Sequence, residues 1–470
     1  MPLYNIAFCG ALSFLAGTLA AGLNLSAFWT VLFFGSAIFV LFSLAKREWR
    51  AALFFVFIFA FGIFYYGFFF NMKEAGQKII FGEITSFSGI VSREPQLSEK
   101  YQRITIELYP PFAGEISVLT SLSPEINYGD TVEATGEIAA PASVGQEPVS
   151  FFPKLKIDEE HKGFWLKGKL INFKKSIIVQ FKKFLPSDSA ALLSGLTLGW
   201  RGDFTDEFKK EMSLSGTTHM VALSGYNITI LVVAVAGIFG YWLSKRATFW
   251  LTSLAILLFI LMVGAESSVI RAAIMGFLAL FAKEAGRRYS VRNAIALTAA
   301  VMVIADPTTL FDIGFQLSFL SLIGIILIEP SIASFLRIGN GPKSFMSWRE
   351  NALTTLSAQL AVAPVLTIVF GNFSLTSIIA NVLILEFVPL TMLLGFMLAF
   401  FGSIFYYSGF LISFLENILL QYELWIIKLF AGWNVPVLSG THSWIFFAIY
   451  YLMLIVFIFY RQNDKSPKLL

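Results

Sequence analysis

The sequence repeats long apolar stretches with very little charge, and this pattern constrains the fold more than any other feature. The first three cover about residues 4–22, 27–45 and 50–70. Each is close to the roughly 20 residues that a helix needs to cross the hydrocarbon core of a bilayer. Hydrophobic residues make up 57% of the chain and charged residues 14%, against about 45–50% and 25% in soluble domains. The sequence therefore predicts an α-helical polytopic membrane protein.

Nine further apolar stretches bring the expected number of spans to about twelve. They cover 221–243, 248–264, 268–284, 290–305, 311–328, 352–370, 376–400, 404–430 and 443–460. Lys and Arg gather in alternate loops, and such loops stay in the cytoplasm. We therefore expect a cytoplasmic (inner) membrane protein with both termini in the cytoplasm. The first stretch lacks a basic n-region and an obvious cleavage site, so we interpret it as a retained span.

Residues of about 80–140 have a different character, with short alternating runs separated by Gly, Pro, Asn and Ser. The runs are Phe87–Val91, Arg103–Leu108, Ile116–Thr120 and Thr131–Ile138. A period of two is typical of strands, and about five strands at this size predict a small inserted OB-like β-barrel. Nine acidic and three basic residues between Glu83 and Glu137 make it a poor general platform for DNA. Three rings are candidates for base stacking, with core packing as the favoured alternative: Tyr101, Phe112 and Tyr128.

The stretch Leu166–Leu185 repeats apolar side chains at spacings of three and four, with lysines largely on the other side. This pattern predicts a basic amphipathic helix in the membrane interface. From Lys154 to Lys183 there are nine lysines and three acidic residues. The lysines are candidates for contact with DNA phosphates, and the alternative is that they hold anionic lipid headgroups. The candidates are Lys167, Lys174, Lys175 and Lys182.

Polar residues inside the apolar stretches point to a functional interior, because a charge there costs roughly 2.5–3.5 kcal/mol on insertion scales. In the expected topology, most of them lie in the outer third of the membrane. We therefore expect a polar vestibule that opens to the outside, and for each single residue the alternative is a helix–helix hydrogen bond without a transport role. The candidate channel or pathway residues are His219, Ser224, Gly225, Asn227, Arg271, Asp306, Gln316, Ser318 and Asn381, with Gln359 and Glu386 lying deeper.

The run from Thr218 to Asn227 is the most distinctive. Ser224 and Gly225 allow close helix approach, and Asn227 follows three residues after Ser224, near the same helix face. A serine hydrolase would need a base beside Ser224, but His219 lies five residues earlier and is poorly phased on a helix. We therefore expect no catalytic residue, with intramembrane hydrolysis as an alternative.

At these residues the sequence resembles the ComEC family of competence proteins, the inner-membrane channels for DNA uptake. The main match runs from Gly199 through Leu231 and includes Gly216-Thr217-Thr218-His219 and Ala222-Leu223-Ser224-Gly225. A second match, from Ser268 through Ile325, holds Arg271-Ala272, Gly286-Arg287, Asp306-Pro307 and Gly314-Phe315-Gln316-Leu317-Ser318-Phe319. A weaker third holds Ala363-Pro364 and Ala380-Asn381. The resemblance implies passage of single-stranded DNA across the cytoplasmic membrane in natural transformation.

The sequence departs from the family pattern in two respects. The family motif often reads Ser-Gly-Leu-His, whereas this chain has Ser224-Gly225-Tyr226-Asn227. Many members also carry a C-terminal metallo-β-lactamase-like nuclease domain, and we expect this form to lack it. The three histidines, His161, His219 and His442, lie far apart in the sequence, without zinc-ligand spacing. We therefore expect no metal, no cofactor and no enzymatic activity.

Together these features divide the chain into five parts. They are a three-span segment at 1–72, an extracytoplasmic OB-like β domain at 73–150, a basic amphipathic interfacial segment at 151–220, a competence-type channel helix bundle at 221–460 and a cytoplasmic tail at 461–470. The segment Gly195–Gly199 lacks the lysine of a nucleotide-binding loop. We therefore expect the partners to be single-stranded DNA, membrane lipids and a separate DNA receptor, nuclease and ATPase motor. The sequence leaves open whether the chain also forms an oligomer.

The main alternative function is a small-molecule or ion transporter. Such a protein is expected to show inverted repeats and discontinuous helices near the membrane midplane. The sequence contains no convincing repeat.

Overall fold

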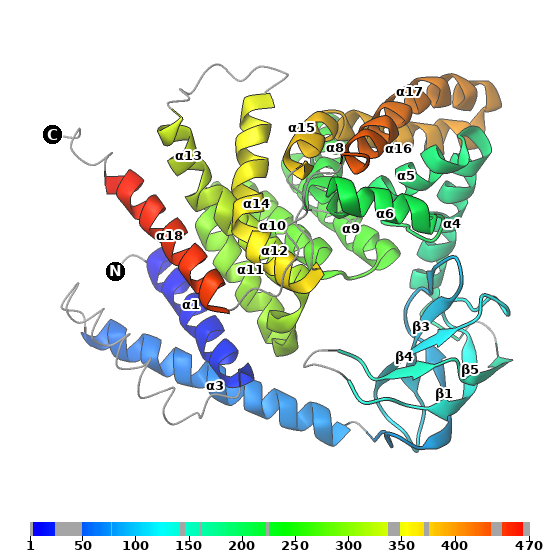
Figure 1. The fold of residues 1–470 in the computed structure, drawn as a ribbon, viewed down its shortest axis with the longest axis horizontal. Coiled ribbons are helices and arrows are strands. Elements are labelled where there is room, and N and C mark those ends of the chain that lie inside the picture. Colours follow the sequence, from blue (N-terminus) through cyan, green and yellow to red (C-terminus); the bar gives the residue numbers. More distant parts are fainter. Residues whose placement is uncertain are drawn as a thin grey trace. The chain divides into compact units, whose positions relative to one another are not determined.

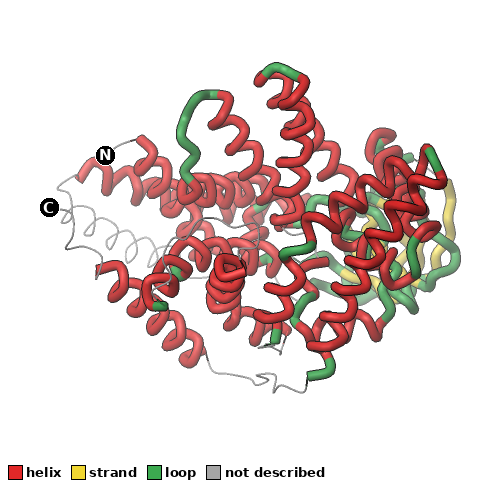
Figure 2. The backbone as a smooth tube through the Cα atoms, turned by 90° about the horizontal axis from the view of Figure 1, so that it is seen from above, coloured by secondary structure: helices red, strands yellow, loops and turns green. Residues whose placement is uncertain are grey.

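The computed structural model describes residues 3–23, 49–76, 78–141, 146–159, 162–221, 225–336, 348–370, 376–433 and 444–463. Helices make up most of the described chain, and strands are confined to one part of it (Figures 1 and 2). This confirms a mostly helical protein with a small β domain. The chain divides into two compact units, Met1–Phe173 with Ile228–Phe315, and Lys174–Asn227 with Gln316–Leu470.

The helices of the first unit come from two distant parts of the sequence. They are α1 (Leu3–Gly22), α3 (Trp49–Gly76), α9 (Lys245–Val263), α10 (Ser267–Glu284), α11 (Val291–Ala305), the 3₁₀ turn η1 (Pro307–Phe311) and most of α8 (Gly225–Trp242). Glycines let α1 and α3 approach closely. A Cβ on Gly17 would meet the carbonyl oxygen of Phe59, and one on Gly62 would lie 2.5 Å from the carbonyl oxygen of Phe14. Small residues at a crossing of this kind are typical of helix packing in membranes.

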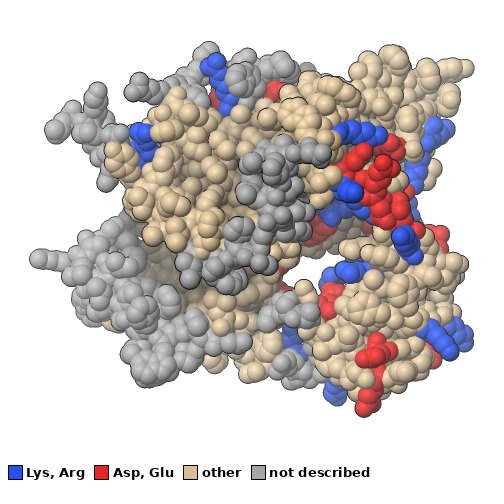
Figure 3. Space-filling model, in the orientation of Figure 1, with Lys and Arg blue, Asp and Glu red and all other residues tan. Residues whose placement is uncertain are grey.

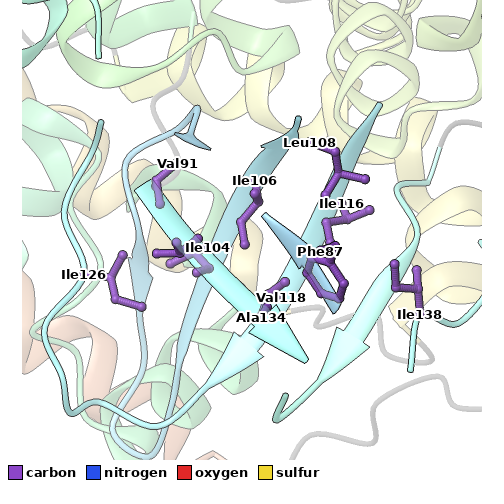
Figure 4. Close-up of a cluster of buried hydrophobic side chains, with 11 residues drawn as sticks. Phe87, Val91, Ile104, Ile106, Leu108, Ile116, Val118, Ile126, Ala134 and Ile138 are labelled. Carbon is purple, nitrogen blue, oxygen red and sulfur yellow. The ribbon is translucent and has the colours of Figure 1, made fainter. Parts of the chain in front are cut away.

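The β domain lies between α3 and α4 in the sequence and has its own core. Its strands are β1 (Ile84–Val91), β2 (Gln96–Leu97), β3 (Gln102–Leu108), β4 (Glu115–Thr120), β5 (Thr131–Glu137), β6 (Val149–Phe151) and β7 (Lys154–Glu159). Alternate residues of these strands point inward and pack together (Figure 4). The four predicted strand runs lie within or overlap β1, β3, β4 and β5, so the period-two pattern located them correctly.

The sheet is mixed and open. Its order is β6-β4-β3-β1-β5-β7, with β2 paired to β3. The β4–β6 pair is parallel, whereas the other ladders are antiparallel. One isolated bridge joins Ala139, after β5, to Val149 of β6 through backbone hydrogen bonds of 2.8 and 3.2 Å. The described strands therefore do not form the continuous closed barrel that the sequence pattern predicts.

Helix α4 (Trp165–Phe184) follows the β domain and coincides with the predicted amphipathic helix. Its first turn is fixed to the sheet. Nζ of Lys167 donates a 2.8 Å hydrogen bond to the carbonyl oxygen of Ser92 and lies 4.6 Å from the ring centre of Tyr128. The hydroxyl of Tyr128 accepts a 3.1 Å hydrogen bond from the backbone N–H of Phe164. These contacts define the orientation of the start of α4 against the β domain.

The second unit contains the remaining helices. They are α5 (Ser187–Leu198), α6 (Asp206–Ser215), α7 (Thr218–Val221), α13 (Glu329–Phe335), α14 (Trp348–Phe370), α15 (Ser377–Leu385), α16 (Val388–Ile404), α17 (Tyr406–Ala431), α18 (Trp444–Asn463) and most of α12 (Ile313–Leu327). Helices α16 and α17 form a tight hairpin. The Cα of Gly402 lies 2.9 Å from the Cβ that Gly409 would carry, and Phe184 covers both glycines.

Six described helical segments are long and apolar enough to cross a membrane: Asn5–Gly22, Ala51–Lys73, Lys245–Val263, Ile313–Phe335, Arg349–Val369 and Tyr406–Ala431. Helices α15 and α16 count as a seventh if the pair, bent by 49° at its break, is one span. Three shorter apolar helices cover Asn227–Trp242, Val291–Ala305 and Phe446–Arg461.

The structure does not confirm the count of twelve spans. The expected span 27–45 lies outside the described residues. Helix α10 corresponds to the expected span 268–284 but carries three charged residues, Arg271, Lys283 and Glu284. The described part of the chain is therefore that of a membrane protein with at least six candidate spans.

Candidate functional site: a buried polar core

The second unit contains a set of buried polar side chains. We call the following set the polar core. Its members all have less than 9% of their surface exposed, and they lie on or beside α5, α6, α7, α8, α15, α16 and α17. They are Ser189, Ser194, Thr197, Ser215, Thr217, Asn227, Thr376, Ser377, Asn381, Thr391, Ser413, Glu416 and Glu423. Polar groups buried among apolar helices are candidates for a functional site.

The turn that carries His219 packs against the start of α15. Gly216 ends α6 in a left-handed conformation, with φ of 70°, and leaves no room for a Cβ beside Ser377. In the same turn the hydroxyls of Ser215 and Thr217 share a 2.8 Å hydrogen bond. His219 lies two residues further on, and its side chain is exposed. The structure thus packs the turn before His219 against the start of the helix that carries Asn381. The vestibule itself stays a prediction.

Asn227 connects the start of α8 to the end of α5. It is 3% exposed, and its Nδ2 donates a 3.0 Å hydrogen bond to the carbonyl oxygen of Leu196. This contact is of the kind that joins one helix to another. Gly225 is the first residue of α8, and Ser224 lies outside the described residues. The geometry of a Ser224 nucleophile therefore stays a prediction.

Asn381 is the most exceptional of the predicted residues. It is fully buried on α15, and neither of its amide atoms has a hydrogen-bond partner among the described residues. An unmet amide of this kind costs about 1–3 kcal/mol. Such a group is retained most readily where it meets water or a polar substrate.

Two buried acids on α17 belong to the same interior, although the sequence analysis did not select them. Glu416 and Glu423 are fully buried within a candidate membrane span. Oε1 of Glu423 accepts a 2.7 Å hydrogen bond from Oγ1 of Thr391 on α16. Both oxygens of Glu416 lack a partner among the described residues. The signal was present in the sequence as two acids seven residues apart in an apolar run, which places them two turns apart on nearly the same helix face.

The other predicted residues of this unit lie on α12 and near α14. Gln316 and Ser318 on α12 are half-buried. Glu386, after α15, accepts a hydrogen bond from Nδ2 of Asn351 on α14. Glu329 accepts a 3.0 Å hydrogen bond from Thr354, also on α14. These acids therefore join helices within the unit.

Arg271 and Asp306 belong to the first unit. Arg271 is 8% exposed on α10. Oδ1 of Asp306 accepts hydrogen bonds from the backbone N–H and the hydroxyl of Thr308, at 2.9 and 2.7 Å. This geometry gives Asp306 a capping role at η1. Asp312 is not among the residues predicted from the sequence. It accepts hydrogen bonds from the hydroxyl of Ser267 and from the backbone N–H of Phe315 and so joins the starts of α10 and α12.

Lys167, Lys174 and Lys182, all candidate surface lysines on α4, have contacts within their own unit. Lys167 is held by Ser92 and Tyr128, as described above, and Lys174 is 3% exposed with its Nζ 5.4 Å from the ring centre of Trp200. Nζ of Lys182 lies 2.7 Å from Oδ1 of Asp203. Lys175 is half-buried. Figure 3 shows side chains of both charges gathered over α5 and α6 rather than a uniformly basic face.

Burial lowers the pKa of Lys167, and nearby Arg93 adds to the effect, while Glu115 and Glu94 oppose it. Arg93 itself bridges Glu115 at 2.7 Å and Glu147 at 2.9 Å. Two of the candidate stacking rings also have roles in the fold. Phe112 packs against the β core and Tyr128 lies under Lys167, whereas Tyr101 is 37% exposed.

The fold and the polar core define a class of protein: a polytopic membrane protein with an inserted β domain and a hydrophilic interior among apolar helices. The family model described as Competence protein matches residues 196–464, which is more than half of the chain. The chain therefore belongs to the Competence protein family, as the resemblance in the sequence predicted.

A curated relative supports this assignment. The chain is 32% identical over 233 residues to ComE operon protein 3 of Bacillus subtilis (strain 168). The matched region is 49% of this chain and 28% of that protein. No solved structure matches the chain.

Proposed function

We propose that the chain is a channel subunit for uptake of single-stranded DNA across the cytoplasmic membrane during natural transformation. Membership of the Competence protein family supports a role in DNA uptake. The observation that carries the channel itself is the polar core, above all Asn381, whose buried amide has unmet hydrogen-bonding capacity among the described residues. Polar groups placed inside a membrane bundle are the usual lining of a substrate path.

The chemistry of the polar core assigns different roles to its members. Hydroxyl and amide groups can donate hydrogen bonds to phosphate oxygens, as in other nucleic-acid complexes. Asn381 and the hydroxyls of Ser377 and Thr217 are therefore the proposed contacts with the strand. Glu416 and Glu423 are not among the proposed contacts with the strand. Arg271, from the first unit, is proposed as a further pathway residue on the strength of its burial in an apolar helix.

The proposed topology keeps both termini in the cytoplasm and the β domain outside. It has about twelve spans, and the β domain acts as an OB-like module near the outer entrance. Two basic segments support this orientation: the loop between the second and third expected spans, with Lys46, Arg47 and Arg50, and the tail after Arg461. Cysteine accessibility from either side of the membrane, at position 100 in the β domain and at position 463, tests it.

The function is tested by deleting the gene and measuring internalised, labelled transforming DNA. We expect loss of uptake, with restoration by the wild-type gene. Asn381→Leu should reach the membrane at wild-type levels but fail to restore uptake, whereas the matched change Leu383→Ile on the same helix should restore it. Full uptake in the deletion strain would refute the proposal.

A small-molecule or ion transporter is the second candidate, and one observation favours it. Helices α15 and α16 form a broken pair with a 49° bend, and a discontinuous helix near buried polar groups is typical of transporters. Binding of labelled single-stranded DNA to purified protein across a salt series separates the two functions. A channel for DNA should bind more weakly as salt rises, because phosphate contacts release counterions.

We propose no enzymatic activity for the chain itself. An intramembrane hydrolase would depend on Ser224, so Ser224→Ala tests that alternative directly. Full DNA uptake in this variant would dismiss the hydrolase.

A further inference from the structure

The β domain carries an exposed apolar surface at one end, which we call the apolar tip. It consists of Ile80, Phe81, Ile84, Phe151 and Phe152, each between 44% and 78% exposed. Exposed apolar groups that cluster in this way mark contact with a protein or a membrane. The proposed DNA-uptake function does not use this surface.

Strand register brings the two segments of the tip together at the end of β5. Ile84, the first residue of β1, pairs with Glu137, the last residue of β5. The backbone N–H of Gly82 donates a 3.1 Å hydrogen bond to the carbonyl oxygen of Ile138. On the other side, the hydroxyl of Ser150 donates a 2.8 Å hydrogen bond to the carbonyl oxygen of Glu137. Residues 80–84 and 151–152 therefore lie on either side of the same strand end.

The conformation at Phe152 holds its ring away from the domain core. Phe152 is the one non-glycine residue with positive φ in the described chain, at 47°. Its backbone N–H donates a 2.8 Å hydrogen bond to the carbonyl oxygen of Leu119, which anchors the turn between β6 and β7. A left-handed conformation is costly for a bulky residue, and such strain is found where function requires it.

The chain itself indicates what covers the tip. Helix α3 contains the candidate span Ala51–Lys73 and ends at Gly76, four residues before Ile80. Four residues reach at most about 14 Å. The tip is therefore tethered within a short distance of the membrane surface from which α3 emerges.

The chemistry of the tip favours lipid over DNA as the occupant. Ile80 and Ile84 offer no ring for base stacking, and the exposed acids Glu83 and Glu137 lie beside them. Acidic neighbours repel a phosphate backbone, whereas aliphatic and aromatic side chains enter the interfacial region of a bilayer readily. We propose that the apolar tip inserts into the lipid headgroup region next to α3 and so fixes the β domain at the membrane surface.

The test uses the full chain in nanodiscs of phosphatidylethanolamine and phosphatidylglycerol. In a Cys9→Ser background, Phe81→Cys and Phe152→Cys are each labelled with an environment-sensitive fluorophore. The matched control is Lys100→Cys, an exposed position in the turn between β2 and β3 that is not part of the apolar tip. Cysteine at position 152 keeps a non-glycine residue in the left-handed conformation, so the backbone strain there is unchanged.

We expect blue-shifted emission at positions 81 and 152, with loss of emission when the nanodiscs contain lipids with a shallow doxyl quencher, and neither effect at position 100. Emission at positions 81 and 152 that matches position 100 would overturn the proposal. A change at position 152 on adding a single-stranded oligonucleotide, without quenching by doxyl lipid, would also overturn it and identify the tip as a DNA surface. Each result is independent of whether the chain conducts DNA.

Discussion

Oγ1 of Thr391 on α16 donates a 2.7 Å hydrogen bond to Oε1 of the fully buried Glu423 on α17. The two residues join the arms of the α16–α17 hairpin. Their contact satisfies one acceptor of an acid that is otherwise enclosed by the bundle, so the hydroxyl is expected to stabilise the hairpin.

Thr391→Val removes that donor while keeping the shape of the side chain. We expect a loss of about 1–3 kcal/mol of unfolding free energy, the cost of a buried polar group without a partner. The control Thr391→Ser keeps the hydroxyl and should stay closer to the wild type. Thermal unfolding in detergent measures both, and equal stabilities for the two variants would contradict the role of the bond.

Glu416 provides a second prediction, because both of its oxygens lack a partner among the described residues. Replacing an unsatisfied buried acid by an apolar residue of similar size is neutral or stabilising. We therefore expect Glu416→Met to unfold at an equal or higher temperature than the wild type. DNA uptake should fall in the same variant if the acid is retained for function. A less stable Glu416→Met protein would show that the acid has an essential structural contact.

A substitution at Gly216 tests the packing between the end of α6 and the start of α15. Gly216→Ala places a Cβ in a left-handed conformation, which costs about 1–2 kcal/mol, and adds an overlap with Ser377. Gly286→Ala is the matched control, since Gly286 has φ of 65° but nothing within 4 Å of its added Cβ. The free energy of unfolding should fall more for Gly216→Ala than for Gly286→Ala. Similar losses in both would mean that α15 does not pack tightly against this turn.

The lowered pKa of Lys167 predicts that the free energy of unfolding depends on pH in the alkaline range. Its pKa in the folded protein lies below the ordinary value of 10.5, so the folded state releases its proton at a lower pH than the unfolded state. The contribution of Lys167 to stability therefore rises with pH between the lowered pKa and the ordinary value, and it is constant below that window. The difference in unfolding free energy between the wild type and Lys167→Met, followed by denaturant titration at several pH values, should shift in favour of the wild type across this window. A difference independent of alkaline pH would contradict the shift.

The sequence predicted what depends on local periodicity. The alternation in Arg103–Leu108 and Ile116–Thr120 located β3 and β4, and the lysine-rich pattern of Leu166–Leu185 located α4. Closure of a barrel depends on pairing between distant strand edges, which alternation does not report. Strands β6 and β7 escaped notice because Val149–Phe151 is too short to show a period and Lys154–Glu159 lies in a basic stretch.

The site was predicted less completely, for a physical reason. A polar residue in an apolar run is visible in the sequence, and Asn381 and Asn227 were found in that way. Whether its polar atoms have hydrogen-bond partners depends on the neighbouring helices. Asn227 is satisfied by Leu196 and Lys182 by Asp203, whereas Asn381 is left without a partner among the described residues. Glu416 and Glu423 could have been selected by the same rule.

A path through the polar core brings the translocating strand into contact with Asn381. In a Cys9→Ser background, Asn381→Cys and the control Leu383→Cys, a partly exposed position on the same helix, are offered single-stranded DNA that carries thiol-reactive bases during uptake. We expect a covalent DNA adduct at position 381 and none at position 383. Uptake at the wild-type rate without any adduct at position 381 would contradict it.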